Sequence, residues 1–353
     1  MKQEIRFCKS ADGTGLAFGL SGGGAPVVRA QHWVTHLDWD FRSPVSEPML
    51  TELSTRFRLL RYDQRGCGLS DADPAEISFE HWVADLEAVV DAAGFDRFAL
   101  VGPSQGSAIA IAYAARHPGR VSHLVLLGGY SRGWNRRGSP ALVERAEALA
   151  RLIEVGWGTQ EATFRQVFTS AFMPGASLEQ QRSFNDMMRL STSADTAARV
   201  FRAFGQIDVD EEARRVSCPC LIAHARGDLR VPFEEGRRLA GLILGARFLP
   251  LESDNHVLLR NEPAWKVYFE ALDGFLPSSG GGEFPKLTQR ERDVLELVAQ
   301  GLDNAQVAAR LDLSEKTVRN HITRIFDKIE VENRSQAIVA ARKAGLGGQP
   351  GAG

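Results

Sequence analysis

Short apolar runs alternate with stretches of helical spacing over the first three-quarters of the chain. Residues 98–101, 121–127, 219–225 and 247–250 are apolar and bounded by turn residues, which is typical of strands buried on both faces. Residues 78–94 carry apolar side chains at helical spacing and residues 107–116 are rich in Ala and Ile, which predicts helices. Strands that alternate with helices predict an α/β fold with a doubly wound, mostly parallel sheet, in which ligands bind at the carboxyl ends of the strands.

This alternation is interrupted at two places. Residues 4–31 contain strand-like runs separated by glycine-containing loops, which predicts an opening hairpin. From about residue 131 to residue 214 the apolar residues keep helical spacing, so we expect a helical cap inserted into the sheet domain. Residues 263–275 predict a closing helix, and we expect the first domain to cover residues 1–276.

Composition predicts the boundary of a second domain. Residues 277–284 include Pro, Ser and consecutive Gly, the composition of a flexible linker. Residues 285–345 return to helical spacing, with 11 Lys and Arg against 9 Asp and Glu, and predict a small all-α domain. The glycine-rich residues 346–353 are expected to be disordered.

The segment Gly102-Pro103-Ser104-Gln105-Gly106 joins a predicted strand to a predicted helix. Small residues two positions before and after Ser104 allow a sharp strand-to-helix turn, and such a turn exposes the serine hydroxyl. The pattern predicts a nucleophile elbow, with the Gln105 N–H free to stabilise an oxyanion. A tight turn without chemistry has the same pattern, so the interpretation depends on partners elsewhere in the chain.

Two residues later in the chain would complete a serine nucleophile. Ser104 needs an imidazole that accepts its proton and a carboxylate that orients the imidazole. Asp228 follows the predicted strand at 219–225 and His256 follows the one at 247–250, which gives the chain order Ser, Asp, His. Asp254 is a competing acid, but its closeness in sequence to His256 makes the geometry awkward. We therefore predict Ser104 as nucleophile, His256 as general base and Asp228 as the orienting acid.

Residues 4–276 resemble the α/β-hydrolase family. Besides the elbow, residues 59–71 (Leu-Leu-Arg-Tyr-Asp-Gln-Arg-Gly-Cys-Gly-Leu-Ser-Asp) are similar to a family motif with a D-x-R-G-x-G-x-S core. The family usually has His-Gly after its third strand, where the loop supplies a second oxyanion donor. This chain has Arg29-Ala30-Gln31-His32-Trp33 there, so the resemblance implies Trp33 N–H and Gln105 N–H as the oxyanion donors, in a narrower pocket.

The predicted cap is rich in large apolar side chains. Most are expected to form core, and some to roof the space over Ser104, which suits a small apolar ester, lactone or carbonyl compound. The residues predicted to line the ligand pocket are Trp33, Trp134, Phe168, Phe172 and Met188. His32, His36, Asp38 and Asp40 are interpreted as a polar loop at the pocket mouth. Because nothing elsewhere completes a ligand set, we predict no metal and no cofactor.

In the second domain, Thr288 and Glu291 predict a capping box at the start of the first helix. A short helix at 304–311 precedes a third helix that begins after Ser314. The apolar positions of this third helix follow steps of 4, 3 and 4 and face the core: Val318, Ile322, Ile325 and Ile329. Its other face carries Lys316, Arg319, Asn320, Thr323 and Arg324. This predicts a helix-turn-helix whose second helix enters the major groove, although a helical docking or dimerisation module has the same spacing.

Residues 285–345 closely resemble the LuxR-type DNA-binding domain. The matching segments are Leu-Thr-Gln-Arg-Glu-Arg-Asp-Val-Leu at 287–295, Ala-Gln-Gly at 299–301 and Leu-Ser-Glu-Lys-Thr-Val-Arg-Asn-His-Ile at 313–322. The resemblance implies a transcription factor that binds DNA. Arg319, Asn320 and Thr323 are the candidates for base edges, and Lys316, Lys328 and Arg334 for phosphates, with Thr317 in the same set. The helix predicted at 335–344 resembles the family's final helix, often a dimer surface.

Composition and net charge are consistent with the predicted two-domain organisation. An apolar content of 44% and a charged content of 24% are ordinary for soluble globular proteins, and a net charge of -2 excludes a chain that coats nucleic acid along its whole length. The charged start lacks the apolar core of a signal peptide, and no run approaches the ~18 apolar residues of a membrane span, so we expect a cytoplasmic protein. The four cysteines do not form a disulfide framework.

Three functions fit this sequence. The first is a ligand-responsive transcriptional regulator, a homodimer on an inverted-repeat operator, whose α/β-hydrolase domain binds the small compound. The second is an active serine esterase or lactonase with an accessory DNA-binding domain; the three triad residues favour it and the missing loop glycine opposes it. The third uses the first domain only as a dimerisation scaffold.

Overall fold

The computed structural model describes residues 3–276, 284, 287–311, 313–344 and 346–347 of the 353-residue chain. Two compact units are present, Met1–Leu276 and Pro277–Gly353. Most of the segment predicted as a linker and most of the predicted disordered tail lie outside the described residues.

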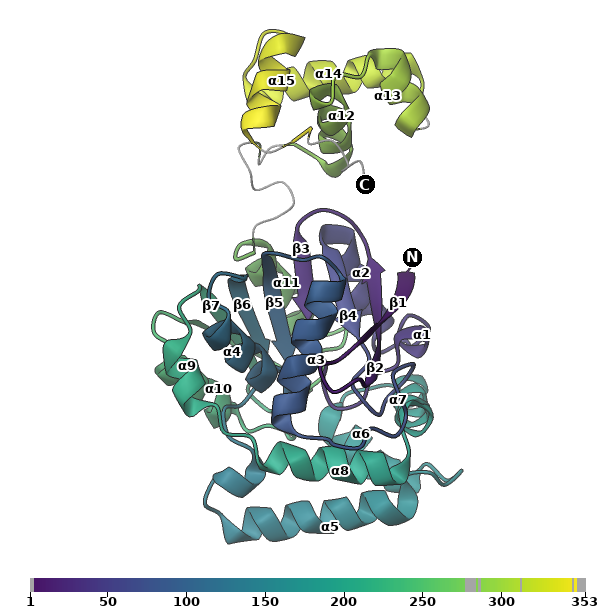
Figure 1. The fold of residues 1–353 in the computed structure, drawn as a ribbon, viewed down its shortest axis with the longest axis vertical. Coiled ribbons are helices and arrows are strands. Elements are labelled where there is room, and N and C mark those ends of the chain that lie inside the picture. The colour runs from purple at the N-terminus through teal and green to yellow at the C-terminus, as the bar shows by residue number, and fades with distance from the viewer. Residues whose placement is uncertain (1–2, 277–283, 285–286, 312, 345, 348–353) are drawn as a thin grey trace. The chain divides into compact units, whose positions relative to one another are not determined.

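The first unit is built on an eight-stranded sheet (Figure 1). Its strands are β1 (Gln3–Lys9), β2 (Gly15–Ser21), β3 (Pro26–Arg29), β4 (Arg58–Tyr62), β5 (Phe98–Pro103), β6 (Val121–Leu127), β7 (Cys220–Ala225) and β8 (Arg247–Leu251). They are arranged in the order β1-β2-β4-β3-β5-β6-β7-β8. β2 pairs antiparallel with β1 and β4, and the remaining neighbours are parallel, which confirms the predicted hairpin and the mostly parallel sheet.

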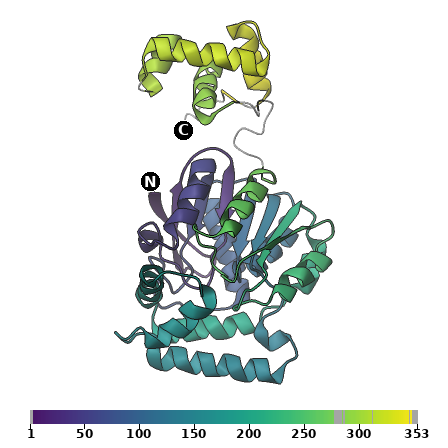
Figure 2. The same ribbon diagram turned by 180° about the vertical axis from the view of Figure 1, so that it is seen from behind.

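Helices cover both faces of the sheet. α3 (Phe79–Ala92) and α4 (Gly106–Arg116) lie on one face (Figure 1), and α2 (Glu47–Arg56) and α11 (Pro263–Asp273) on the other (Figure 2). Strand residues alternate between two apolar cores, so that Val28 packs on the first face and Val27 on the second. The central strands are therefore apolar on both sides, as their sequences indicate.

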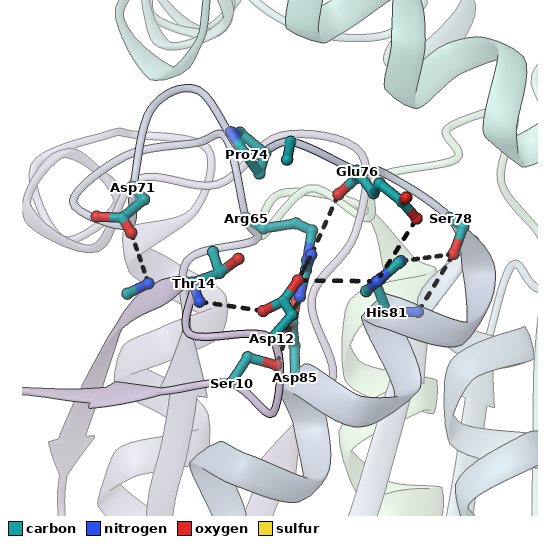
Figure 3. Close-up of polar contacts among 12 residues, drawn as sticks. Ser10, Asp12, Thr14, Arg65, Asp71, Pro74, Glu76, Ser78, His81 and Asp85 are labelled. Carbon is teal, nitrogen blue, oxygen red and sulfur yellow. Dashed lines mark hydrogen bonds and ion pairs between the residues drawn. The ribbon is translucent and has the colours of Figure 1, made fainter.

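The loop after β4 is held by a buried ion pair (Figure 3). The fully buried guanidinium of Arg65 donates to the Asp85 carboxylate of α3 at 2.8 and 2.6 Å and to Asp12, in the β1–β2 loop, at 2.7 Å. Gly68, with φ 57, lies so close to Asp63 that a Cβ there would be 2.1 Å from a carboxylate oxygen. The D-x-R-G-x-G motif thus joins the hairpin, the sheet and α3.

Between β6 and β7 the described chain forms helices: η1 (Trp134–Arg136), α5 (Pro140–Gly156), α6 (Thr163–Phe172), α7 (Leu178–Ser191), α8 (Ala194–Gly205) and α9 (Asp210–Arg215). α5 and α8 run side by side beyond the carboxyl ends of the parallel strands (Figures 1 and 2). α10 (Phe233–Leu242) follows β7 and packs on β7 and β8.

The second unit contains α12 (Gln289–Ala299), α13 (Asn304–Leu311), α14 (Glu315–Ile329) and α15 (Arg334–Lys343). Thr288 and Glu291 form the predicted capping box at the start of α12. One apolar cluster joins the four helices and includes Val294, Val318 and Ile325. None of the helices in the described parts of either unit has the length and apolar character needed to span a membrane.

Candidate active site and DNA-binding surface

Ser104 follows β5 at a strained turn. Its φ is 52°, in the left-handed region that costs a non-glycine residue about 1–2 kcal/mol. The neighbouring glycines allow this turn to close, because a Cβ on Gly102 would lie 2.7 Å from the Gly106 oxygen and one on Gly106 would lie 2.4 Å from the Gln31 oxygen. The Ser104 N–H donates to the Leu127 carbonyl at 2.8 Å. This is the geometry of a nucleophile elbow.

Asp228 and His256 meet beside this turn. His256 Nδ1 lies 2.6 Å from Asp228 Oδ2, and both residues are buried. Asp228 Oδ1 accepts the backbone N–H groups of Arg230 and Val231, each at 2.8 Å. Burial alone would raise the pKa of Asp228, but the charge and hydrogen bond of His256 lower it below its ordinary value. An ionised carboxylate on Nδ1 leaves Nε2 as the nitrogen available for a serine proton.

The competing acid, Asp254, lies on the other side of the loop. A Cβ on Gly227 would be 1.9 Å from Asp254 Oδ1, so the Asp254 side chain packs against the Gly227 backbone. The His256 N–H and the Val257 N–H donate to the Phe172 carbonyl at the end of α6. The loop after β8 is therefore attached to the helices that follow β6, and the imidazole faces Asp228.

The two predicted oxyanion donors are unoccupied main-chain groups. Within the described residues, neither the Trp33 N–H nor the Gln105 N–H has a hydrogen-bond acceptor in the protein. The amide side chains of Gln31 and Gln105 hydrogen-bond at 3.0 Å, which joins the loop after β3 to the elbow. The indole of Trp33 packs against Trp157 and Phe168, with ring centroids 5.5 and 6.2 Å away. A tryptophan is accommodated at this position because its ring lies in the helical core.

Ser104 borders two cavities, which share Trp33, Ser104 and Phe172. The first, called the apolar chamber here, lies between β3, β5, α2 and α11 and also contains His256; its other apolar lining includes Met49, Leu50, Leu53, Phe184, Met187 and Leu258. The second, called the arginine chamber, is lined by Gln105, Tyr130, Trp134, Arg137, Arg145 and Arg230. A small ligand has space on both sides of the serine.

The predicted pocket residues have different positions in the structure. Trp33, Trp134 and Phe172 line one or both chambers. Phe168 and Met188 are buried, and neither is part of the lining of the two chambers as described. The contribution of α2 and α11 was not predicted, because helical spacing marks an apolar face without indicating which cavity that face borders.

The side chains of His32 and Asp40, in the segment after β3, do not form a set of metal ligands. Asp40 pairs with Arg61 at 2.6 Å. Burial, followed by the charges of Arg29, His256 and Arg61, lowers the pKa of His32 well below its ordinary value, so its imidazole is neutral. Among the described residues no group of three or more His, Cys, Asp or Glu side chains could hold a metal ion.

On α14 the basic and polar residues of the predicted outer face are exposed: Lys316, Arg319, Asn320, Thr323 and Arg324. Thr317 is partly buried, and its N–H donates to the capping Ser314 hydroxyl at 3.1 Å. Val318, Ile322 and Ile325 face the core. The exposed face is thus separate from the packed one, as an element that enters a DNA groove requires.

Two of the predicted phosphate ligands have partners inside the domain. Lys328 Nζ lies 2.9 and 2.6 Å from the buried Glu291 carboxylate, which ties α14 to α12. Burial alone would raise the pKa of Glu291, but Lys328 and the N-cap hydrogen bonds lower it to about 2. Arg334 donates to the Asn304 side chain at 3.0 Å and to the Leu302 carbonyl. These two cations hold helices together.

Comparison with known proteins agrees with both units. Residues 39–263 match the family model for the alpha/beta hydrolase fold, and residues 285–341 match the model for bacterial regulatory proteins of the luxR family. The chain therefore belongs to the α/β-hydrolase fold family, and its second unit is a LuxR-type DNA-binding domain.

Individual relatives match one unit each. AB hydrolase superfamily protein YisY of Bacillus subtilis (strain 168) is 27% identical over 220 residues, 62% of this chain and 82% of that protein. Spore germination protein GerE of the same organism is 48% identical over 61 residues, 17% of this chain and 82% of GerE. Among solved structures, the esterase EaEST from Exiguobacterium antarcticum superimposes with a TM-score of 0.66 at 22% identity, over 77% of this chain and 99% of the esterase, which shows the fold.

Proposed function

We propose that the protein is a transcriptional regulator whose DNA affinity responds to a small apolar ester, lactone or carbonyl compound bound beside Ser104. The observation that supports this is the presence, in one chain, of a LuxR-type domain with an exposed basic face on α14 and a hydrolase-fold unit with two chambers at its serine. A ligand that binds one conformation of the first unit more tightly shifts the chain toward that conformation.

The proposed operator contact follows from α14. Arg319, Asn320 and Thr323 are exposed within about one turn of α14 and would reach base edges, while Lys316 would contact phosphate. We propose a homodimer, which reads an inverted repeat with half-sites about one DNA turn apart. Lys328 and Arg334, which have partners inside the domain, would contribute less to phosphate binding than Lys316.

Selection from random-sequence DNA with the full chain tests this proposal. The expected product is an inverted repeat whose affinity changes when ligand is added. Arg319→Ala should weaken binding to that repeat by about 1–3 kcal/mol, and most at one base position. Lys266→Ala, which removes one exposed cation from α11, is the charge-matched control and should bind DNA like the parent. Failure to enrich any sequence would contradict the proposal.

A second candidate is an active serine esterase or lactonase, with DNA binding as an accessory property. It is favoured by the 2.6 Å His256–Asp228 contact, by the strained Ser104 and by the free N–H groups of Trp33 and Gln105. Hydrolysis of short p-nitrophenyl esters by the parent, lost in Ser104→Ala, is the expected result for this function. Equal rates at the level of buffer in both proteins would exclude it for these esters and leave a binding role for the chamber.

A further inference from the structure

Arg29 is a charged residue at the end of the apolar chamber. It is the last residue of β3, on the same face as Val27, and it is aligned with Arg61 of β4 and Val101 of β5. Val101 precedes Ser104 by three positions, so the chamber extends from the serine along the α2 and α11 face of the sheet to this guanidinium. The lining of the chamber also includes the apolar side chains of Leu50, Leu53 and Leu258.

Within the described residues the Arg29 guanidinium has no hydrogen-bond acceptor, no carboxylate within ion-pair distance and no aromatic ring stacked on it. The guanidinium of the neighbouring Arg61, in contrast, has partners of all three kinds. It pairs with Asp40 at 2.6 Å, donates to the Leu37 carbonyl at 2.6 Å and to Gln3 at 3.0 Å, and lies over the Phe41 ring. Arg61 is therefore satisfied by the fold, and Arg29 is not.

No carboxylate among the described residues that line the chamber pairs with Arg29. Among the described residues that line it, Asp40 is the only carboxylate, and Arg61 already engages it. Burial lowers the pKa of Arg29 to about 10, which still leaves the guanidinium charged at neutral pH. An arginine has five N–H donors, and Arg29, which is half-buried in the lining of the chamber, can present them to a ligand there.

We propose that the apolar chamber binds a ligand with an apolar body, an ester or lactone carbonyl at Ser104, and a carboxylate at its other end that pairs with Arg29. The planar guanidinium matches a carboxylate in a bidentate pair. Tyr268, which lines the same end of the chamber and whose pKa is raised by burial, supplies a protonated hydroxyl as a further donor. The inference rests on the proposed ligand-binding function and adds the chemical class of the ligand.

Titration calorimetry tests whether the chamber binds ligands that carry a carboxylate. The protein is the full chain with Ser104→Ala, which prevents turnover. The probes are monomethyl and dimethyl esters of the same linear dicarboxylic acids, from succinate to sebacate, because each pair differs by one charge. The half-ester should bind about 10- to 100-fold more tightly than the diester, the range expected for hydrogen bonds to a charged group. The preference should be largest at one chain length, which reports the separation between Ser104 and Arg29.

Three further variants identify the group responsible. Arg29→Met in the same background should remove the preference for the half-ester over the diester, and Arg29→Lys should retain part of the preference. Arg58→Met removes an exposed arginine from the neighbouring strand and should retain all of it. Unfolding followed by tryptophan fluorescence checks each variant, and Arg29→Lys alone decides the question if Arg29→Met does not fold.

The outcomes separate this inference from the proposed function. Equal affinity for half-ester and diester, a preference that survives in Arg29→Met, or a preference that is undiminished in Arg29→Lys would overturn the carboxylate assignment while leaving a ligand-binding chamber. Binding of neither probe at any chain length would contradict the ligand-binding function itself, and the carboxylate assignment with it.

Discussion

The strained backbone of Ser104 should reverse the usual effect of an Ala-to-Gly replacement on the stability of the first unit. At most positions, replacing Ala by Gly destabilises a protein, because glycine loses more conformational freedom on folding. Ser104 has φ 52°, where glycine is unstrained and alanine is not. We therefore expect Ser104→Gly to be more stable than Ser104→Ala.

The magnitude follows from two opposing terms. Alanine in the left-handed region costs about 1–2 kcal/mol, and the extra entropy of glycine in the unfolded chain costs about 0.5–1 kcal/mol. The difference favours Ser104→Gly by about 0–1.5 kcal/mol, centred on about 0.7 kcal/mol. Ala84→Gly in the interior of α3 is the matched control, where glycine should instead destabilise by about 1 kcal/mol.

Urea unfolding followed by tryptophan fluorescence measures this difference in the full chain. All six tryptophans lie in the first unit, at positions 33, 39, 82, 134, 157 and 265, so the signal does not report on the DNA-binding domain. With equal denaturant slopes, the midpoints give the difference in the free energy of unfolding. The reasoning fails if Ser104→Gly is less stable than Ser104→Ala by an amount similar to that at position 84.

Three further predictions concern packing and charge. Gly106→Ala should destabilise the first unit by about 1–3 kcal/mol, because the new methyl group would meet a backbone oxygen. Gly241→Ala, in open space on α10, should instead stabilise the unit by about 0.5–1 kcal/mol. Urea midpoints, measured by fluorescence, that move in the same direction for both variants would contradict this reasoning. Arg65→Met leaves the buried Asp85 carboxylate without its partner and should lower the free energy of unfolding by about 3–5 kcal/mol in the same assay. Arg116→Met, which breaks an exposed pair, should lower it by less than about 1 kcal/mol. Similar losses for the two variants would show that burial is not the cause. Glu291→Gln should raise hydrogen exchange in peptides of α14 about tenfold at neutral pH, measured by mass spectrometry. Because the folded pKa of Glu291 is about 2 and its ordinary value is 4.5, this stabilisation is present above pH 4.5 and is lost as the pH falls through 2, and exchange unaffected by the substitution would remove the assigned role.

Several features of the fold are predictable from short stretches of sequence. β6 spans Val121–Leu127, the range that its apolar run predicts, and α4 begins at Gly106, next to the predicted start. The elbow is also predictable, since the glycines around Ser104 are a local steric requirement. The capping box of Thr288 and Glu291 depends on residues three positions apart. In each case the physical cause acts within a few residues, and the pattern is visible without knowledge of the fold.

The tertiary structure decided which distant residues share a site. The sequence favours Asp228 over Asp254 only because Asp254 is close in sequence to His256, and it is the loop geometry after β7 and β8 that places Asp228 on His256. Lys328 is basic and lies on α14, the helix proposed to contact DNA, yet its pairing with Glu291 requires the packing of α12 on α14.

The apolar chamber is a further case, because it forms where β3, α2 and α11 meet. Arg29 there has no partner among the residues that the structure describes, while the adjacent Arg61 pairs with Asp40. Periodicity and turn chemistry are local and can be read along the chain. The pairing of charges and the lining of cavities depend on contacts between segments far apart in sequence, which only the folded topology brings together.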